Sequence, residues 1–289
     1  MSKRLCSITF LIAIVCAVAA SCSNSSNRAF AAAPKAEAFT VVLDPGHGGT
    51  DLGATYKEGK TTFSEKDAVL GLAKEAKRQL EKKGYPVLLT RDRDADIALN
   101  ARTAIANRAK AKIFISLHMN SLPPKTGKNA KALTSTAEGI ETYLLNSTTD
   151  GTSKRLAELE NKGLDPTQGS KLTNETEVNL ILKDMVLDSN LSESKRLACT
   201  LQSQLTQLTK QKTRGVKQAM FVVLLGADMP CTLVEAGFVT SERDRKMISS
   251  EHGVRAMAAA VVRAVEQFRS TQGTEIARQS LSRCLISDQ

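Results

Sequence analysis

Short apolar runs alternate with helical patterns along most of this 289-residue chain, and no other feature constrains its fold as much. The runs that predict β-strands are 39–43, 85–89, 113–117, 139–145, 219–225 and 231–235. The segments that predict helices are 64–83, 99–110, 152–162, 176–188, 192–210 and 243–269. Apolar strands that alternate with helices are typical of a mostly parallel sheet, so the sequence predicts an α/β fold with helices on both faces of the sheet.

The first 37 residues differ from this pattern. Residues 1–22 resemble an export signal, because Lys3 and Arg4 precede an apolar run that is short for a membrane span. The sequence around Cys22 also resembles a lipoprotein processing site, so plain export and lipid attachment both remain open. Residues 23–37 are rich in Ser, Asn and Ala and predict a tether. We expect an exported protein of the periplasm or cell envelope, either free or anchored to the membrane through Cys22.

Composition narrows the classes of partner. The formal net charge of +10 fits either a well-solvated exported protein or one that is attracted to a polyanion. Only 4% of the residues are aromatic and tryptophan is absent, which leaves few platforms for stacking bases. We therefore expect no nucleic acid partner, and an anionic cell-wall polymer or a membrane is favoured.

Three cysteines lie beyond the leader, at positions 199, 231 and 284. Their odd number and the lack of a C-x-x-C pair argue against a disulfide framework and against a cysteine–zinc site. A single disulfide remains compatible with the sequence.

Two of the three histidines follow apolar runs that predict buried strands. His47 comes after Val41-Val42-Leu43-Asp44-Pro45-Gly46, and His118 comes after Ile113-Phe114-Ile115-Ser116-Leu117. Strand ends at the carboxyl edge of an open α/β sheet are the usual place for ligands. Two imidazoles placed at that edge suggest a metal site.

Two acidic residues could complete such a site. Glu65 stands in the first turn of the helix predicted at 64–83, where it is either a third metal ligand or an acid that is favourable for the helix dipole. Glu235 ends an apolar strand, where a carboxylate must be paired with a neighbouring arginine or used in chemistry. In the second case Glu235 would be a general base for a water molecule.

Four motifs in order give the chain a family resemblance. They are Val42-Leu43-Asp44-Pro45-Gly46-His47-Gly48-Gly49; Ser64-Glu65-Lys66-Asp67; Leu99-Asn100-Ala101-Arg102 with Ala106-Asn107 and Ile115-Ser116-Leu117-His118-Met119-Asn120; and Arg214-Gly215-Val216-Lys217-Gln218-Ala219 with Met229-Pro230 and Leu233-Val234-Glu235-Ala236-Gly237-Phe238. Together they span residues 40 to 268. The chain resembles the zinc-dependent N-acetylmuramoyl-L-alanine amidases of bacterial cell division.

This resemblance implies a fold, a cofactor and a reaction. The fold is a single α/β domain, which we place at 38–269, with a central six-stranded sheet. His47, Glu65 and His118 would bind one Zn²⁺ per chain, and Glu235 would be the catalytic acid and base. The substrate would be peptidoglycan, cleaved at the amide between N-acetylmuramic acid and L-alanine of the stem peptide.

Two polar segments interrupt the alternation of strands and helices. Residues 121–137 predict a long loop after His118, and residues 146–192 predict an insertion with helical but polar sequence. In some relatives a helix in the corresponding insertion plugs the zinc site until an activator protein removes it. We therefore predict that 146–192 is a mobile lid, with an inhibitory role and an activator as open questions. Its carboxylates that could reach the metal are Glu158, Glu160, Glu175, Glu177 and Asp184.

Weaker patterns leave alternatives. Ser192-Glu193-Ser194-Lys195 fits S-x-x-K and Lys125-Thr126-Gly127 fits K-T-G, so a penicillin-sensitive serine carboxypeptidase activity is one alternative. A non-catalytic peptidoglycan-binding module is another. The glycines after the first strand do not match the dinucleotide fingerprint, because Asp51 stands where its third glycine belongs. His252 is expected to be a surface or capping residue, and the tail 270–289 has only a weak pattern.

Overall fold

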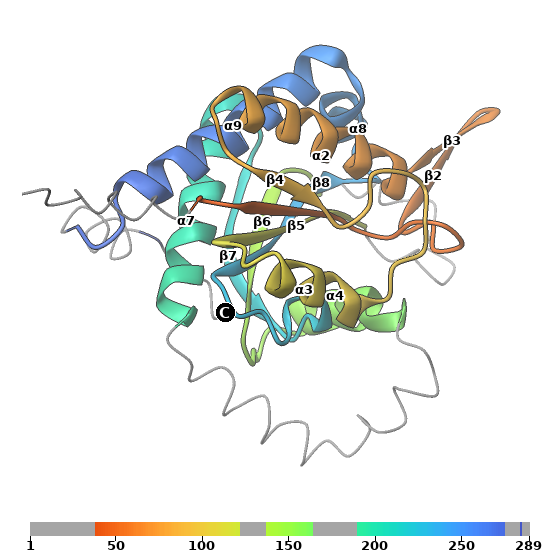
Figure 1. Ribbon diagram of the computed structural model, residues 1–289. Helices are drawn as coiled ribbons and strands as arrows, with labels where there is room; N and C mark the ends of the chain where they lie inside the picture. Colours follow the sequence, from red (N-terminus) through yellow and green to blue (C-terminus); the bar gives the residue numbers. More distant parts are fainter. Residues whose placement is uncertain (1–37, 122–136, 164–189, 275–283, 285–289) are drawn as a thin grey trace, which may run out of the picture. The chain divides into compact units, whose positions relative to one another are not determined.

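A six-stranded sheet forms the centre of the protein (Figure 1). The computed structural model describes residues 38–121, 137–163, 190–274 and 284. The strands, in their order across the sheet, are β4 (Val87–Leu89), β1 (Val41–Pro45), β5 (Ile113–Asn120), β8 (Cys231–Phe238), β6 (Ile140–Leu145) and β7 (Thr213–Ala219).

The sheet is mostly parallel, as the sequence predicts. β4, β1, β5 and β8 run in the same direction, and β6 lies antiparallel to β8 and parallel to β7. All residues of β1, β5 and β8 are buried, which explains why these strands are apolar over most of their length. The start of β6 and the start of β7 therefore lie at the same edge of the sheet as the carboxyl ends of β5 and β8.

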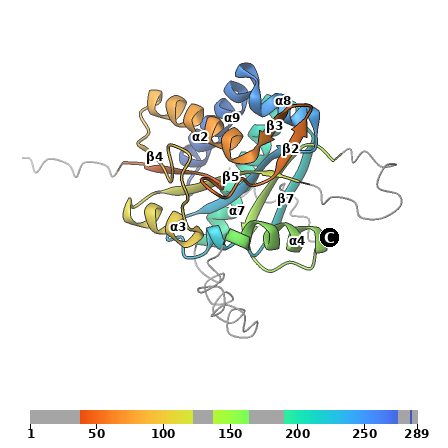
Figure 2. The same cartoon turned by 90° about the vertical axis from the view of Figure 1, so that its right-hand side faces the viewer.

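Helices cover both faces of the sheet (Figures 1 and 2). One layer contains α2 (Glu65–Lys82), α8 (Glu242–Ser249) and α9 (Glu251–Ser270), with α7 (Asn190–Thr209) packed against α9 and β6. The opposite layer contains α3 (Leu99–Arg108) and α4 (Gly151–Glu160), which continues into the short 3₁₀ turn η1 (Asn161–Gly163). This arrangement confirms the predicted fold class.

The buried stripe of α2 also matches its sequence pattern. Its apolar side chains are buried at a helical spacing, and these are Val69, Leu72, Ala73, Ala76 and Leu80. Ser64 stands at the N-cap position of α2 but makes no capping hydrogen bond. Its hydroxyl group donates instead to the carbonyl of Leu52, at 3.4 Å.

The strand predicted at 219–225 is wrong. That apolar run contains the 3₁₀ turn η2 (Val222–Leu224), and Phe221, Val223 and Leu224 are buried beneath α3. The strand itself is the more polar β7, just before the run. A short apolar run has no clear period, so burial in an irregular turn and burial in a strand look alike in sequence.

Two further differences have local causes. The helix predicted at 243–269 is two helices, because Ser250 adopts an extended backbone conformation and accepts a hydrogen bond from the amide of Gly253. A hairpin of β2 (Thr55–Glu58) and β3 (Thr61–Ser64) was not predicted. Its turn contains Gly59 at a φ of 61°. A glycine between two short runs is a sequence signal for such a turn, and it was available here.

A disulfide joins Cys199 of α7 to Cys284 in the tail, and Cys231 is a buried free thiol. The sequence left room for this single bridge without indicating it. The tail prediction is otherwise open, since α9 continues to Ser270 and most later residues lie outside the described part. The predictions for 1–22, 23–37, 125–127 and 176–188 also lie outside it. Within the described residues, no helix is long and apolar enough to cross a membrane.

Candidate metal centre

The loop after β1 holds His47 in an unusual backbone conformation. Its φ is 59°, a region that residues with side chains seldom adopt and that costs about 1–3 kcal/mol where strained. Gly46 lies against the imidazole of His118, so closely that a Cβ atom there would come within 2.3 Å of Cε1. The Gly46-His47 pair therefore lets the two histidine side chains approach each other.

Two buried arginines hold this loop in place. Arg102 donates to the carbonyl groups of Pro45 and His47 at 2.9 and 3.0 Å, and Arg91 donates to those of Pro45 and Gly46 at 3.0 and 2.6 Å. Backbone carbonyl groups in a buried loop need hydrogen-bond donors. The two guanidinium groups supply these donors and so stabilise the strained backbone around His47.

The charge of Arg102 is balanced by Asp44. Its Nη1 atom lies 2.8 Å from Oδ1 of Asp44, and both side chains are buried. Burial raises the pKa of Asp44, but Arg102 and the hydroxyl groups of Thr90 and Ser116 outweigh burial and lower it. Asp44 therefore stays ionised and anchors the arginine beneath the histidine loop.

Glu65 begins α2 and its side chain is fully buried. Its Oε1 atom accepts a hydrogen bond from the amide of Met119 at 2.8 Å, and its Oε2 atom accepts one from the amide of Ala54 at 2.7 Å. These bonds fix the carboxylate between the first helix and β5, so its position reflects more than a favourable helix dipole.

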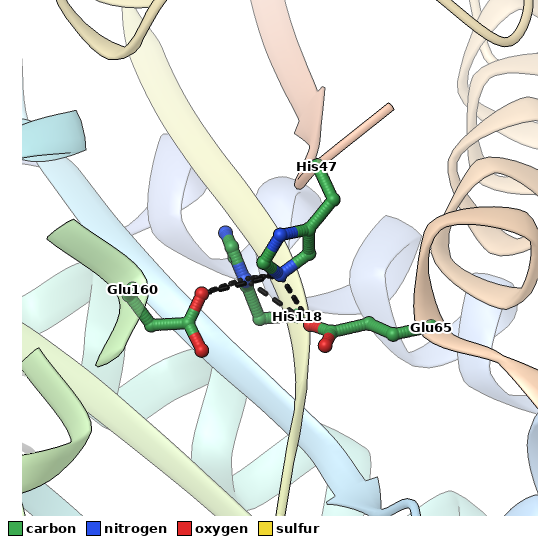
Figure 3. A group of neighbouring side chains, drawn as sticks. All are labelled: His47, Glu65, His118 and Glu160. Atoms are coloured by element: carbon green, nitrogen blue, oxygen red, sulfur yellow. Dashed lines mark hydrogen bonds and ion pairs between the residues drawn. The ribbon is translucent and has the colours of Figure 1, made fainter. Parts of the chain in front are cut away.

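The side chains of His47, Glu65, His118 and Glu160 converge at one point (Figure 3). Nε2 of His47 lies 3.1 Å from Nδ1 of His118 and 3.0 Å from Oε1 of Glu65. Oε2 of Glu160 lies 3.2 Å from that Nε2 and 3.0 Å from that Nδ1. The four ligand atoms all lie within 4.8 Å of one another.

This donor set suits a metal ion. Two imidazole nitrogens face each other, and this contact is favourable only when a proton or a cation lies between them. Tetrahedral zinc with bonds of about 2.0–2.1 Å would separate its ligand atoms by roughly 3.3 Å, close to the contacts found here. Nitrogen and carboxylate oxygen ligands of this kind are typical of catalytic zinc sites.

The electrostatics of the cluster also favour a cation. Burial lowers the pKa of His47, but the carboxylate of Glu65 and hydrogen bonds to Asp51 and Glu160 outweigh it and raise the pKa. The pKa of Glu65 is lowered by its histidine neighbours despite burial. Three carboxylates around two imidazoles thus attract positive charge to the centre of the cluster.

Asp51 orients His47 from outside the cluster. Its Oδ2 atom lies 2.8 Å from Nδ1 of His47. This contact directs Nε2 toward the other ligand atoms, as carboxylates commonly do for histidines that bind metals. No sequence pattern indicated this role for Asp51.

Glu235 lies on β8 directly opposite His118 of β5. It is fully buried, and within the described residues neither of its carboxyl oxygens has a hydrogen-bond partner. Burial raises its pKa well above the usual range, and the charges of Glu160 and Glu65 raise it further. The described residues therefore provide no arginine salt bridge for Glu235, and the alternative that it is used in chemistry is favoured.

Helix α4 covers this edge of the sheet on one side, and its last residue is Glu160. Beside the cluster is a cleft of about 250 Å³, lined by His47, Thr50, Asp51, Leu159, Glu160 and Lys162. The sequence had named Glu160 as one of five carboxylates that could reach the metal but could not select it. Glu158, two residues earlier, is exposed, and the other three lie outside the described residues.

Comparisons with known proteins agree with this site. The model of the N-acetylmuramoyl-L-alanine amidase family Amidase_3 matches residues 41–267. The chain belongs to this amidase family. Amidase AmiA of Escherichia coli (strain K12) is 30% identical over 79% of this chain and 75% of its own length. Amidase AmiC of Neisseria meningitidis is 33% identical over 80% of this chain, which spans about half, 53%, of that relative.

The fold has solved counterparts in this amidase family. The crystal structure of an N-acetylmuramoyl-L-alanine amidase from Clostridium difficile 630 is similar with a TM-score of 0.59 and 29% identity, covering 82% of this chain and 99% of the other. The family match begins and ends within the 38–269 range expected for the domain. The comparisons do not favour the serine-type or the non-catalytic alternative. Ser192 is exposed in the first turn of α7, and His252 is exposed in that of α9, as expected.

Proposed function

We propose that this protein is a zinc-dependent peptidoglycan hydrolase that cleaves the amide between N-acetylmuramic acid and L-alanine. The observation that carries the proposal is the pairing of a metal-binding cluster with an unpartnered buried carboxyl group on the next strand. Membership of the amidase family supplies the bond that is cleaved. His47, Glu65 and His118 are the proposed ligands of one Zn²⁺ per chain, and Glu235 is the proposed acid and base.

In this proposal the metal, Glu235 and the loop arginines have separate roles in the reaction. Zinc, when bound, supplies a Lewis acid that polarises the amide carbonyl and lowers the pKa of water. Glu235 takes the proton of the attacking water and then gives it to the leaving amine of L-alanine. Burial raises the pKa of Glu235, which suits the second step because the carboxyl group must hold the proton until it gives it to the amine. The loop arginines keep His47 in place throughout the reaction.

We further propose that the segment 146–192 inhibits the enzyme by occupying the metal centre. The contacts of Glu160 with both histidines support this, because its carboxylate stands where a fourth ligand or a water molecule would bind. The carboxyl end of α4 also carries partial negative charge, which favours a nearby cation. An activator protein that moves α4 would then expose the site. The amidase would act outside the cytoplasm, in the periplasm or cell envelope, with or without a lipid at Cys22.

One experiment tests the activity directly. Purified protein is incubated with muropeptides, with and without a chelator, and the products are identified by mass spectrometry. We expect free stem peptide with L-alanine at its amino end, and no such product with the chelator. Loss of a terminal D-alanine instead, blocked by penicillin, would favour the serine carboxypeptidase alternative.

A further inference from the structure

Four side chains form a row across the sheet at its active edge. His118 on β5 lies opposite Glu235 on β8, and Glu235 lies opposite Glu141 on β6. Arg214 on β7 continues the row, because its Nε atom lies 2.5 Å from Oε1 of Glu141. Neighbouring strands are about 4.8 Å apart, so Arg214 begins roughly 10 Å from Glu235 along the row. A substrate held at the metal centre would therefore reach Arg214 within two residues of the cleaved bond.

Glu141 is the buried centre of this part of the row. Its Oε1 atom accepts from Arg214 and from Nζ of Lys217 at 2.8 Å, and its Oε2 atom accepts from Asn120 at 2.9 Å and Tyr143 at 2.7 Å. Burial raises its pKa, but Lys217 and Arg214 outweigh burial and lower it. One ionised carboxylate is therefore shared by two cations, and Lys217 also interacts electrostatically with the carboxylate of Asp150.

Arg214 is placed to offer its own positive charge to a ligand. Its side chain is 29% exposed, whereas that of Glu141 is 1% exposed. Within the described residues only its Nε atom donates a hydrogen bond, so both terminal nitrogens remain available. The guanidinium carbon lies 5.0 Å from the centre of the Phe238 ring, which keeps the group over an apolar surface.

A small cavity of about 50 Å³ lies over Arg214, between the sheet and α4. Asn120, Glu141, Arg214 and Phe238 line it from the sheet, and Arg155, Leu156 and Leu159 line it from α4. Such a volume holds a water molecule or two and not a peptide. Leu159 precedes Glu160, so movement of α4 away from the metal would also open this cavity into a groove.

We propose that Arg214 is the recognition site for a carboxylate of the stem peptide, on the residue after L-alanine. The proposal rests on the amidase function proposed above. That residue of a peptidoglycan stem is a glutamate linked through its side chain, and it carries either a free α-carboxylate or the amide of it. Arg214 would bind the free carboxylate through its terminal nitrogens, while Glu141 and Lys217 hold its position.

The test compares two soluble muramoyl tripeptides that differ only at this carboxyl group, free in one and amidated in the other. For the zinc-loaded wild-type protein we expect kcat/KM to be roughly tenfold or more higher for the free acid, the range of a hydrogen bond to a charged group. Arg214→Gln should lose this preference through a higher KM for the acid, with little change for the amide. Equal loss on both substrates, or a wild-type protein without preference, would overturn the proposal.

Arg155→Gln is the matched control. It removes the same charge from the same cavity, but from α4 and not from the sheet, so the ratio of acid to amide should not change. If Arg155→Gln abolishes the preference and Arg214→Gln does not, recognition belongs to α4 and the proposal is wrong. If neither the wild-type protein nor Glu160→Gln cleaves either tripeptide, the proposed amidase function is refuted instead. Calorimetric titration of the wild-type protein and Glu160→Gln with the two tripeptides would still measure the preference for the free acid. Equal affinities for the acid and the amide would overturn the proposed role of Arg214.

Discussion

The carboxylate of Glu160 contacts both histidines of the metal centre, with Oε2 at 3.0 Å from Nδ1 of His118 and 3.2 Å from Nε2 of His47. Glu160 ends a helix that follows β6, whereas the histidines lie at the ends of β1 and β5. The carboxylate of a separate helix can leave the cluster without disturbing the two histidines that the sheet positions.

Glu160→Gln should therefore raise basal turnover. Glutamine keeps the size of the side chain but removes the charge that holds α4 at the metal, so more molecules are open. We expect a rise of roughly tenfold or more, measured as release of soluble fragments from purified peptidoglycan. Glu158→Gln on the exposed side of α4 is the matched control and should leave the rate unchanged. If Glu160→Gln binds zinc and works no faster, α4 is part of the substrate groove and not a plug.

His118→Ala should lose metal and activity together, because it removes one of three ligands from a closed set. Zinc content after dialysis, measured by atomic emission, checks this. His252→Ala removes an exposed histidine from α9 and should retain one zinc per chain. Full zinc content in His118→Ala would show that the ligand assignment is wrong.

Glu235→Gln should keep zinc and lose at least about 10²-fold in kcat, since an amide cannot take a proton from water. The buried side chain has the same shape, so the thermal midpoint should change little. Turnover near that of the wild type would exclude Glu235 as the acid and base.

Asp44→Asn should destabilise the protein by about 3–5 kcal/mol at pH 7, because it leaves Arg102 buried without its counter-charge. The pKa of Asp44 is lowered in the folded state, so its contribution is present above the unfolded pKa of about 3.9 and is lost as the pH falls through the folded value. The difference between variant and wild type should thus narrow at pH 3. Urea denaturation with chelator at both pH values measures it, and an equal difference at both would contradict the ion-pair explanation.

Cys284→Ser should lower the free energy of unfolding by about 2–4 kcal/mol, because the disulfide closes a loop between residues 85 positions apart. A reducing agent should destabilise the wild type to a similar extent and leave Cys284→Ser unchanged. A wild-type protein that is insensitive to reduction would mean that the bond does not form in solution.

The sequence predicted the elements whose pattern is periodic or wholly apolar. The strands at β1, β5 and β8 and the buried stripe of α2 are of this kind. β7 was not predicted because two of its positions are charged residues, Arg214 and Lys217, that pair with the buried Glu141, a partner that is distant in sequence. The His47 and His118 pair was visible because strand ends are informative, whereas the position of Glu65 became certain only when its contacts with Met119 and Ala54 were known.

The remaining parts of the site depend on packing between distant segments. Nothing local distinguishes Glu160 from Glu158, and only the direction of α4 over the sheet brings one of them to the histidines. The same holds for Asp51, whose contact with His47 depends on a turn through glycines at positive φ. Sequence reasoning found the residue types of the site and missed the contacts that arrange them.

The order of the site residues along the chain means that the site is completed late in synthesis. His47, Glu65 and His118 lie in the first half of the chain, whereas Glu235 belongs to β8, the last strand of the sheet to be synthesised. β8 also lies between β5 and β6, so its insertion joins the strand of His118 to the strands of Glu141 and Arg214. A chain that lacks β8 also lacks Glu235 and the strand that joins β5 to β6. In the proposed mechanism such a chain has no residue to carry the proton, so we expect no hydrolysis of the wall until the last strand is in place.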